Sequence, residues 1–227
     1  MRKMILALTL LLAVALPAHA QKPPTLPGLV EGEQYTAIED GKPFQPQAPG
    51  KIEVIEVFAY WCPHCAHMAP KLEAWKATLP KSVVVSLMPA AFFPDDPYML
   101  GYFAADAAKA VPATHARMFA AIHETGELAR NSTLDQVAAF YLRLPGIDAK
   151  AFKAALADQA GMGKKMLAAR EFQIRSKIPG TPALVVDGRY LVLGNSYDSL
   201  LANTRKVIDA IAASQKPAAE AATKPRS

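Results

Sequence analysis

Cysteine is scarce in this chain, with two among 227 residues. Two cysteines cannot supply the disulfide scaffold of a small secreted protein, so a hydrophobic core must hold the fold together. Hydrophobic residues make up 52% of the sequence and charged residues 20%, which excludes a largely disordered chain and a collagen-like one. Because a domain has about 100–200 residues, the length predicts one domain, or one domain with a large insertion.

Long hydrophobic runs are missing after residue 20, and the run before it is short. Residues 1–3 are basic, residues 4–20 hold no Lys, Arg, Asp or Glu, and the Ala-His-Ala at 18–20 fits a small-x-small cleavage rule. These features predict a secretory signal peptide at residues 1–20. An uncleaved membrane anchor is the alternative, although about 20 apolar residues are needed to span a bilayer. We expect the mature protein to be exported and soluble.

A surplus of basic charge is also missing from the body of the chain. The formal net charge is +5, of which residues 1–20 and the tail at 215–227 each contribute +2. Nucleic-acid binding usually shows a face rich in Lys and Arg, and no region between these ends has that density. We therefore expect no nucleic-acid partner.

Short strand patterns surround one long helical block. Runs of β-branched and aromatic residues predict strands, and apolar residues three or four apart predict amphipathic helices. The predicted strands are residues 51–60, 82–88, 183–186 and 189–193, with a short one near 35–38, and helices are predicted at 63–79 and 197–213. Asp187-Gly188 predicts a tight hairpin between the last two strands. The block between Pro89 and Pro182 is helical in period.

This order of elements predicts an α/β fold, in which a mixed sheet with helices on its faces carries an all-helical insertion. The first part of the sheet domain is expected at residues 21–89 and the second part at 176–213. The insertion is expected at 90–175, with a flexible tail at 214–227. Inside the insertion, Thr133 and Gln136 predict a capping box that opens a helix near Leu134.

The two cysteines, Cys62 and Cys65, lie where the second predicted strand turns into a helix. A disulfide between them would close almost no loop and would stabilise the fold little by that route. Thiols of exported proteins are normally oxidised, so the pair is interpreted as a redox-active dithiol, with two inert buried thiols as the alternative. Pro63 suits the first helical position, and Cys62 lies beside the free N–H groups that stabilise an anion. The geometry predicts an exposed, acidic first thiol and a shielded, ordinary second one.

The residue between the cysteines adds to this argument. A partly protonated His64 imidazole near Cys62 would stabilise the thiolate further, whereas the alternative makes His64 a solvated surface residue. Each pKa unit by which the thiolate is stabilised favours the reduced form by about 1.4 kcal/mol. That stabilisation disappears in the disulfide, so the protein is expected to pass its disulfide on.

Residues 58–65 (FAYWCPHC), the Gly180-Thr181-Pro182 segment and the final strand-strand-helix pattern resemble the thioredoxin superfamily. The Cys-Pro-His-Cys version, the signal peptide and the helical insertion resemble the bacterial periplasmic thiol:disulfide oxidoreductases of that superfamily. The resemblance covers approximately residues 34–213. It implies a thioredoxin-like sheet and the donation of a Cys62–Cys65 disulfide to exported, folding proteins in the periplasm. No cofactor and no metal are expected.

The resemblance also assigns roles to residues outside the dithiol. It implies that Pro182 is cis beside the cysteines and that the Thr181 backbone pairs with an extended client chain. It places a buried acid at Glu56, six residues before the first cysteine, as a proton acceptor for Cys65, whereas the alternative is a solvated Glu at a strand edge. Ala69 stands where many relatives carry a second acid, so a relay of two acids is not expected.

The aromatic residues before the dithiol and the expected partners complete the prediction. Phe58 is expected in the core, and Trp61, next to the reactive thiol, is expected to contact the client. The implied partners are exported proteins with free cysteines and a quinone-linked membrane protein that reoxidises the dithiol. The protein is expected to be a monomer.

Three other functions share some of these features. A disulfide isomerase or reductase has the same local motifs, and a Thr before the Pro is also found among isomerases. The arm before Lys51, however, leaves no room for the separate dimerisation domain of the family's isomerases. A metal site of Cys62, Cys65, His64 and His67 is disfavoured, because one helical turn cannot wrap four side chains tetrahedrally. A binding or chaperone module with an incidental dithiol would keep its function after Cys62→Ala.

Overall fold

The computed structural model describes residues 21–223 and the side chains of residues 21–215. The predicted signal peptide at residues 1–20 lies outside the described residues. Among residues 21–223, the structure holds no helix that combines the length and the apolar character needed to cross a bilayer.

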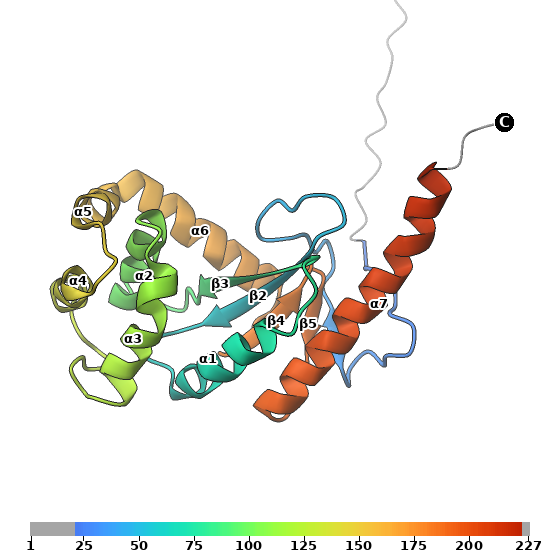
Figure 1. The fold of residues 1–227 in the computed structure, drawn as a ribbon, viewed down its shortest axis with the longest axis horizontal. Coiled ribbons are helices and arrows are strands. Elements are labelled where there is room, and N and C mark those ends of the chain that lie inside the picture. Colours follow the sequence, from blue (N-terminus) through green and yellow to red (C-terminus); the bar gives the residue numbers. More distant parts are fainter. Residues whose placement is uncertain (1–20, 224–227) are drawn as a thin grey trace, which may run out of the picture.

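A five-stranded mixed sheet forms the centre of the fold (Figure 1). Its strands are β1 (Tyr35–Ala37), β2 (Ile52–Phe58), β3 (Val83–Pro89), β4 (Ala183–Val186) and β5 (Tyr190–Val192), in the spatial order β1-β5-β4-β2-β3. Strand β2 pairs in parallel with β3 and antiparallel with β4. Every residue of β2 is buried, which matches the continuous apolar and β-branched pattern of a central strand. The expected mixed sheet is therefore confirmed.

The two faces of the sheet are covered by different helices. Helices α1 (Pro63–Lys76) and α7 (Tyr197–Thr223) pack on one face, where Val54 of β2 meets Leu72 and Val207. The opposite face contacts the helical insertion, and Val57 lies in that second core with Phe172. Alternate residues of β2 thus enter different cores, as the period of two in a strand requires.

Five helices lie between β3 and β4, and α2 to α5 gather at one end of the sheet (Figure 1). They are α2 (Pro97–Ala107), α3 (Val111–His123), α4 (Leu134–Arg143), α5 (Ala149–Ala157) and α6 (Gln159–Arg175). The capping box predicted before Leu134 is confirmed, because the Thr133 side chain accepts from the Gln136 N–H and the Gln136 side chain accepts from the Thr133 N–H.

The predicted hairpin joins β4 to β5. Asp187 has φ 56° and Gly188 has φ 63°. Two successive residues with positive φ form the type I′ turn that matches the right-handed twist of the flanking strands.

Both helix ends predicted for the sheet domain differ from the structure. Helix α1 ends at Lys76 instead of Leu79, and it includes Pro70. Helix α7 continues to Thr223, so the predicted end at Ala213 was wrong. The segment after Ala213 is rich in alanine, the strongest helix former, and extending an existing helix avoids the cost of nucleating one.

Candidate active site

The dithiol lies where the central strand ends and α1 begins. Strand β2 stops at Phe58, and the Cys62 N–H donates to the Ala59 carbonyl oxygen at 3.1 Å across the connecting turn. Cys62 is the N-cap residue of α1 with extended backbone angles (φ −82°, ψ 118°), and Pro63 occupies the first turn. Both cysteines are free thiols in this structure. The strand-to-helix position expected from the sequence is confirmed.

The Cys62 sulfur is surrounded by groups that favour its thiolate. The pKa of Cys62 is lowered to about 5, chiefly by a hydrogen bond from the Cys65 thiol. Burial opposes this shift, while the Thr181 side chain and the backbone N–H groups of Cys65 and His64 add to it. The direction agrees with the predicted acidic thiol. The predicted exposure was wrong, because Cys62 is only 6% exposed and its Sγ lies 3.3 Å from the Thr181 carbonyl oxygen, to which the thiol donates.

The Cys65 sulfur has the opposite surroundings. Cys65 is completely buried, and burial raises its pKa far above the ordinary value. The hydrogen bond to Cys62 and the negative charge of Glu56 raise the pKa further. The sequence predicted an ordinary second thiol, which underestimated the effect of burial. The two sulfurs therefore differ strongly in acidity.

Glu56 projects from β2 into the protein interior and is 1% exposed. Among the described residues neither of its carboxyl oxygens has a hydrogen-bond partner. Burial raises its pKa to about 8, and the charges of Glu73 and Cys62 act in the same direction. The carboxyl group is therefore protonated at pH 7, and the alternative of a solvated Glu at a strand edge is excluded.

His64 contacts the last helix. Its side chain is exposed, and its Nδ1 lies 3.1 Å from the Tyr197 hydroxyl oxygen at the start of α7. The pKa of Cys62 is lowered by the backbone N–H of His64, whereas the His64 imidazole is hydrogen-bonded to Tyr197. Stabilisation of the thiolate by the imidazole itself stays a prediction.

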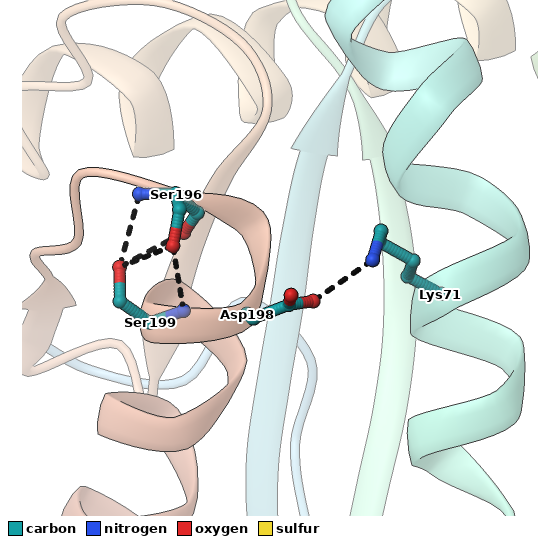
Figure 2. Close-up of polar contacts among 4 residues, drawn as sticks. All are labelled: Lys71, Ser196, Asp198 and Ser199. Carbon is teal, nitrogen blue, oxygen red and sulfur yellow. Dashed lines mark hydrogen bonds and ion pairs between the residues drawn. The ribbon is translucent and has the colours of Figure 1, made fainter.

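Further contacts fix the first turn of α7 against α1. Lys71 Nζ lies 2.9 Å from Asp198 Oδ1, and Figure 2 shows this ion pair between the two helices. On the other side of the same turn, the Ser196 N–H donates to the Ser199 hydroxyl and the Ser199 N–H to the Ser196 hydroxyl (Figure 2). Because these bonds satisfy free N–H groups at the helix start, they hold the segment that carries Tyr197.

Thr181 and Pro182 lie beside the Cys62 sulfur, as the contact of Cys62 with the Thr181 carbonyl shows. The Thr181–Pro182 peptide bond is cis, as expected. These two residues also line a hollow of about 410 Å³ that extends to His64, Tyr197 and Leu200.

Trp61 is half-buried and held by a residue that sequence reasoning missed. Its indole Nε1 donates to Asp96 Oδ2 at 2.7 Å. The other oxygen of Asp96 accepts from the Tyr98 N–H at 2.8 Å, so Asp96 is also the N-cap of α2. An Asp directly before Pro97 is a recognisable helix start, but nothing in the sequence indicates that this Asp contacts Trp61.

A second missed contact supports the turn before Cys62. The Tyr60 hydroxyl lies 2.8 Å from His115 Nδ1, and His123 Nε2 donates to the Tyr60 carbonyl oxygen at 2.7 Å. Both histidines belong to α3. Burial lowers the pKa of His115 to about 4, so this ring is neutral at pH 7, and its Nδ1 forms a hydrogen bond with the Tyr60 hydroxyl. The insertion thus holds the segment that leads to the dithiol.

Within the part of the chain that the structure describes, no group of three or more His, Cys, Asp and Glu side chains is placed to hold a metal ion.

The fold and the paired thiols at a strand-to-helix junction define a thiol:disulfide oxidoreductase with a thioredoxin fold. The sequence model of the family described as Thioredoxin matches residues 45–209. The chain is 34% identical to the thiol:disulfide interchange protein DsbA of Bordetella parapertussis, over 78% of this chain and 82% of the relative. It is 33% identical to DsbA of Azotobacter vinelandii, over 84% of this chain and 87% of the relative.

Solved structures agree with these relatives. The crystal structure of the oxidoreductase DsbA from Xylella fastidiosa superposes with a TM-score of 0.73 at 39% identity, covering 83% of this chain and 98% of the other. That of Pseudomonas aeruginosa DsbA gives a TM-score of 0.68 at 26% identity, covering 83% and 95%. The chain belongs to the DsbA family, and it is an enzyme of dithiol-disulfide exchange.

Proposed function

We propose that the oxidised protein donates its Cys62–Cys65 disulfide to exported proteins as they fold in the periplasm. The observation that carries this proposal is the contrast between the two sulfurs. Cys62 is held as an acidic thiol with a pKa of about 5, while burial keeps Cys65 protonated. A stabilised thiolate favours the reduced form over the disulfide, which makes the disulfide a strong donor.

The exchange proceeds in two displacements. A client thiolate attacks Cys62 Sγ, the bond between the two enzyme sulfurs breaks, and Cys65 leaves with the electron pair. A second client thiolate then attacks the client sulfur of the mixed disulfide, and Cys62 leaves as a thiolate. The client loses two electrons and the enzyme gains them. The second step is favoured because a thiol of low pKa is a good leaving group.

Glu56 is proposed to donate a proton to the Cys65 sulfur in one direction of the reaction and to accept it in the other. A buried thiolate at Cys65 is costly, so the departing sulfur needs a proton in the first displacement. The Glu56 carboxyl is protonated at pH 7, and the charge of its ionised form raises the pKa of Cys65, so the two groups are electrostatically coupled. When the dithiol is reoxidised, Glu56 first releases its proton to solvent, and the carboxylate, the minor form at pH 7, then accepts the Cys65 proton and frees Cys65 to attack.

The other roles concern binding. The Thr181 backbone and Pro182 are proposed to receive an extended client chain, with Trp61 contacting it beside the sulfur. Pro63 and His64 contribute to thiolate stabilisation through the first turn of α1. A DsbB-like membrane partner linked to quinone is proposed to reoxidise the dithiol, and the protein is proposed to act as a monomer.

Equilibration with glutathione redox buffers tests the donor role against that of a reductase. We expect the dithiol to remain reduced in a buffer in which half of the glutathione is oxidised. The reduction potential of the dithiol would then lie well above that of the glutathione couple. A potential near about −270 mV, as in thioredoxin, would contradict the proposal. Cys65→Ser is the matched control, because its hydroxyl can replace the Cys65 thiol as the donor to the Cys62 sulfur and the variant forms only mixed disulfides with glutathione.

A further inference from the structure

Two hollows lie on opposite sides of Cys62. Strand β2 leads to Cys62 and lies between β4 and β3 in the sheet. The Thr181-Pro182 segment enters β4, so the hollow of about 410 Å³ lies on that side. The segment after β3 borders a second hollow of about 580 Å³, which Trp61 and Pro63 also line. Residues next to Cys62 line both hollows: Trp61 and Pro63 line the larger one and His64 lines the smaller one.

The second hollow, here named the Trp61–Phe93 pocket, is lined by Trp61, Pro63, Phe93, Asp95, Asp96 and Arg130, among others. Its walls are aromatic: the Trp61 and Phe93 rings lie 6.1 Å apart between centroids. Phe93 is 59% exposed and is one of four large hydrophobic residues that the described part of the chain leaves on the surface. An apolar surface of this kind beside a reacting sulfur favours an apolar occupant.

The pocket is ordered before any client arrives. Asp96 is buried and holds the Trp61 indole at 2.7 Å while it also caps α2. The orientation of the indole is thus tied to the insertion through a charge-assisted hydrogen bond. Binding to a fixed wall costs less side-chain entropy than binding to a mobile one.

The rim of the pocket distinguishes aromatic from aliphatic occupants. Arg130 and Asp95 are exposed at the rim, and neither forms an ion pair with any of the described residues. A guanidinium without a carboxylate partner can lie over an aromatic ring, which an aliphatic side chain does not offer. The two aromatic walls favour the same occupant through edge-to-face contacts.

We propose that the Trp61–Phe93 pocket binds an aromatic side chain of the client polypeptide, close to the client cysteine that forms the mixed disulfide with Cys62. This inference rests on the proposed function, since the covalent bond to Cys62 is what brings the client to the pocket. The pocket selects clients on the side of Cys62 opposite Thr181 and Pro182. From the client cysteine, the client chain enters the pocket in only one of its two directions. An aromatic residue therefore matters on one side of that cysteine, either the amino-terminal or the carboxyl-terminal side.

Stopped-flow oxidation of dithiol peptides tests this inference. Three peptides of otherwise identical sequence carry Ala on both sides of the reacting cysteine, Phe on the amino-terminal side, or Phe on the carboxyl-terminal side. We expect the native protein to oxidise one Phe peptide about fivefold faster than the Ala peptide at low concentration, the effect of one aromatic contact. Phe93→Ser should remove this preference, and Arg130→Gln should reduce it about twofold.

The controls separate binding from folding and from chemistry. Val30→Ser removes another exposed hydrophobic residue, 54% exposed and in the segment before β1, and should keep the preference. All three variants should oxidise glutathione at the native rate, because glutathione has no aromatic side chain. Two results would contradict the proposal that the pocket binds an aromatic side chain: a preference that persists in Phe93→Ser, or an equal rate for all three peptides with the native protein. Neither result would contradict disulfide donation. Failure to oxidise both glutathione and the Ala peptide would instead remove the proposed function, and the pocket with it.

Discussion

Two glutamates three residues apart on β2 have opposite surroundings. Both are buried, Glu53 at 0% and Glu56 at 1% exposure. Glu53 accepts hydrogen bonds from the Phe44 N–H at 2.7 Å, the Gln45 N–H at 2.9 Å and the Gln47 side chain at 3.2 Å. Glu56 has no partner among the described residues. The same residue type on the same strand thus fixes a loop at one position and has no hydrogen-bond partner among the described residues at the other, where we propose that it transfers a proton.

The two cysteines repeat the contrast. Cys62 is placed where hydrogen bonds stabilise its anion, and Cys65, one turn further into α1, is placed where burial prevents ionisation. In both pairs, the environment of a residue decides its chemistry more than its type does.

The largest effect is expected from Glu56→Gln. The pKa of Glu56 is raised from 4.5 to about 8, so its stabilising contribution is complete below pH 4.5 and is lost as the pH rises to about 8. The variant does not titrate and should gain stability over the native protein across that window, by on the order of 3 kcal/mol at pH 8. Urea unfolding of the reduced proteins at pH 4, 6 and 8 measures the difference. A gap independent of pH would show that Glu56 titrates normally.

The opposite sign is expected from Glu53→Gln. An amide offers one acceptor oxygen in place of two, so a backbone N–H of Phe44 or Gln45 loses a charge-assisted bond. The variant should be destabilised by about 2 kcal/mol in urea unfolding, in both redox states. Its equilibrium with glutathione should remain that of the native protein, because Glu53 contacts neither sulfur. A shifted equilibrium would mean that the two glutamates do not have separate roles.

From the surroundings of the two cysteines we predict that the difference in folding stability between the reduced and the oxidised protein depends on pH. The folded pKa of Cys62 is depressed, so its contribution to the reduced form is complete above the unfolded pKa of about 9 and is lost as the pH falls through about 5. The reduced protein should exceed the oxidised one in stability by on the order of 2 kcal/mol at pH 7. Melting temperatures of both forms at pH 4 and 7 measure this. Cys62→Ser forms no disulfide and keeps the Glu56 titration, so it is compared with the reduced native protein: its melting temperature should lack the contribution that Cys62 makes between pH 4 and 7. An identical pH dependence in the two proteins would assign the effect to another group.

Local features of this chain could be predicted, whereas the contacts that tune the site could not. The strand before Cys62, Pro63 in the first turn and the Asp187-Gly188 turn follow from short-range preferences and were confirmed. The resemblance supplied the cis bond before Pro182. The exposure of Cys62 was predicted wrongly, because a helix start is exposed unless another segment covers it.

The missed contacts all join distant parts of the sequence. Trp61 and Asp96 are 35 residues apart, Tyr60 and His115 are 55 apart, and His64 and Tyr197 are 133 apart. Periodicity indicates which face of a helix is buried, but it does not indicate which polar partner that face meets. The identity of such a partner depends on how the insertion and α7 pack against the sheet.

The smallest effect on stability is expected from a substitution of His123, which contacts the turn before Cys62. Two histidines of α3 contact Tyr60 in this turn, and they bind different atoms of it. His123 donates to the Tyr60 carbonyl, and His115 forms a hydrogen bond with the Tyr60 hydroxyl. His123→Ala should leave a partly buried carbonyl without its donor and destabilise the protein by about 1 kcal/mol. His123→Gln keeps a donor and should recover most of this loss.

Ultraviolet titration of Cys62 in both variants measures the consequence for the site. If the turn positions the Cys62 sulfur at the start of α1, the pKa of Cys62 should rise in His123→Ala and return to its native value in His123→Gln. An unchanged Cys62 titration in His123→Ala would restrict this contact to stability.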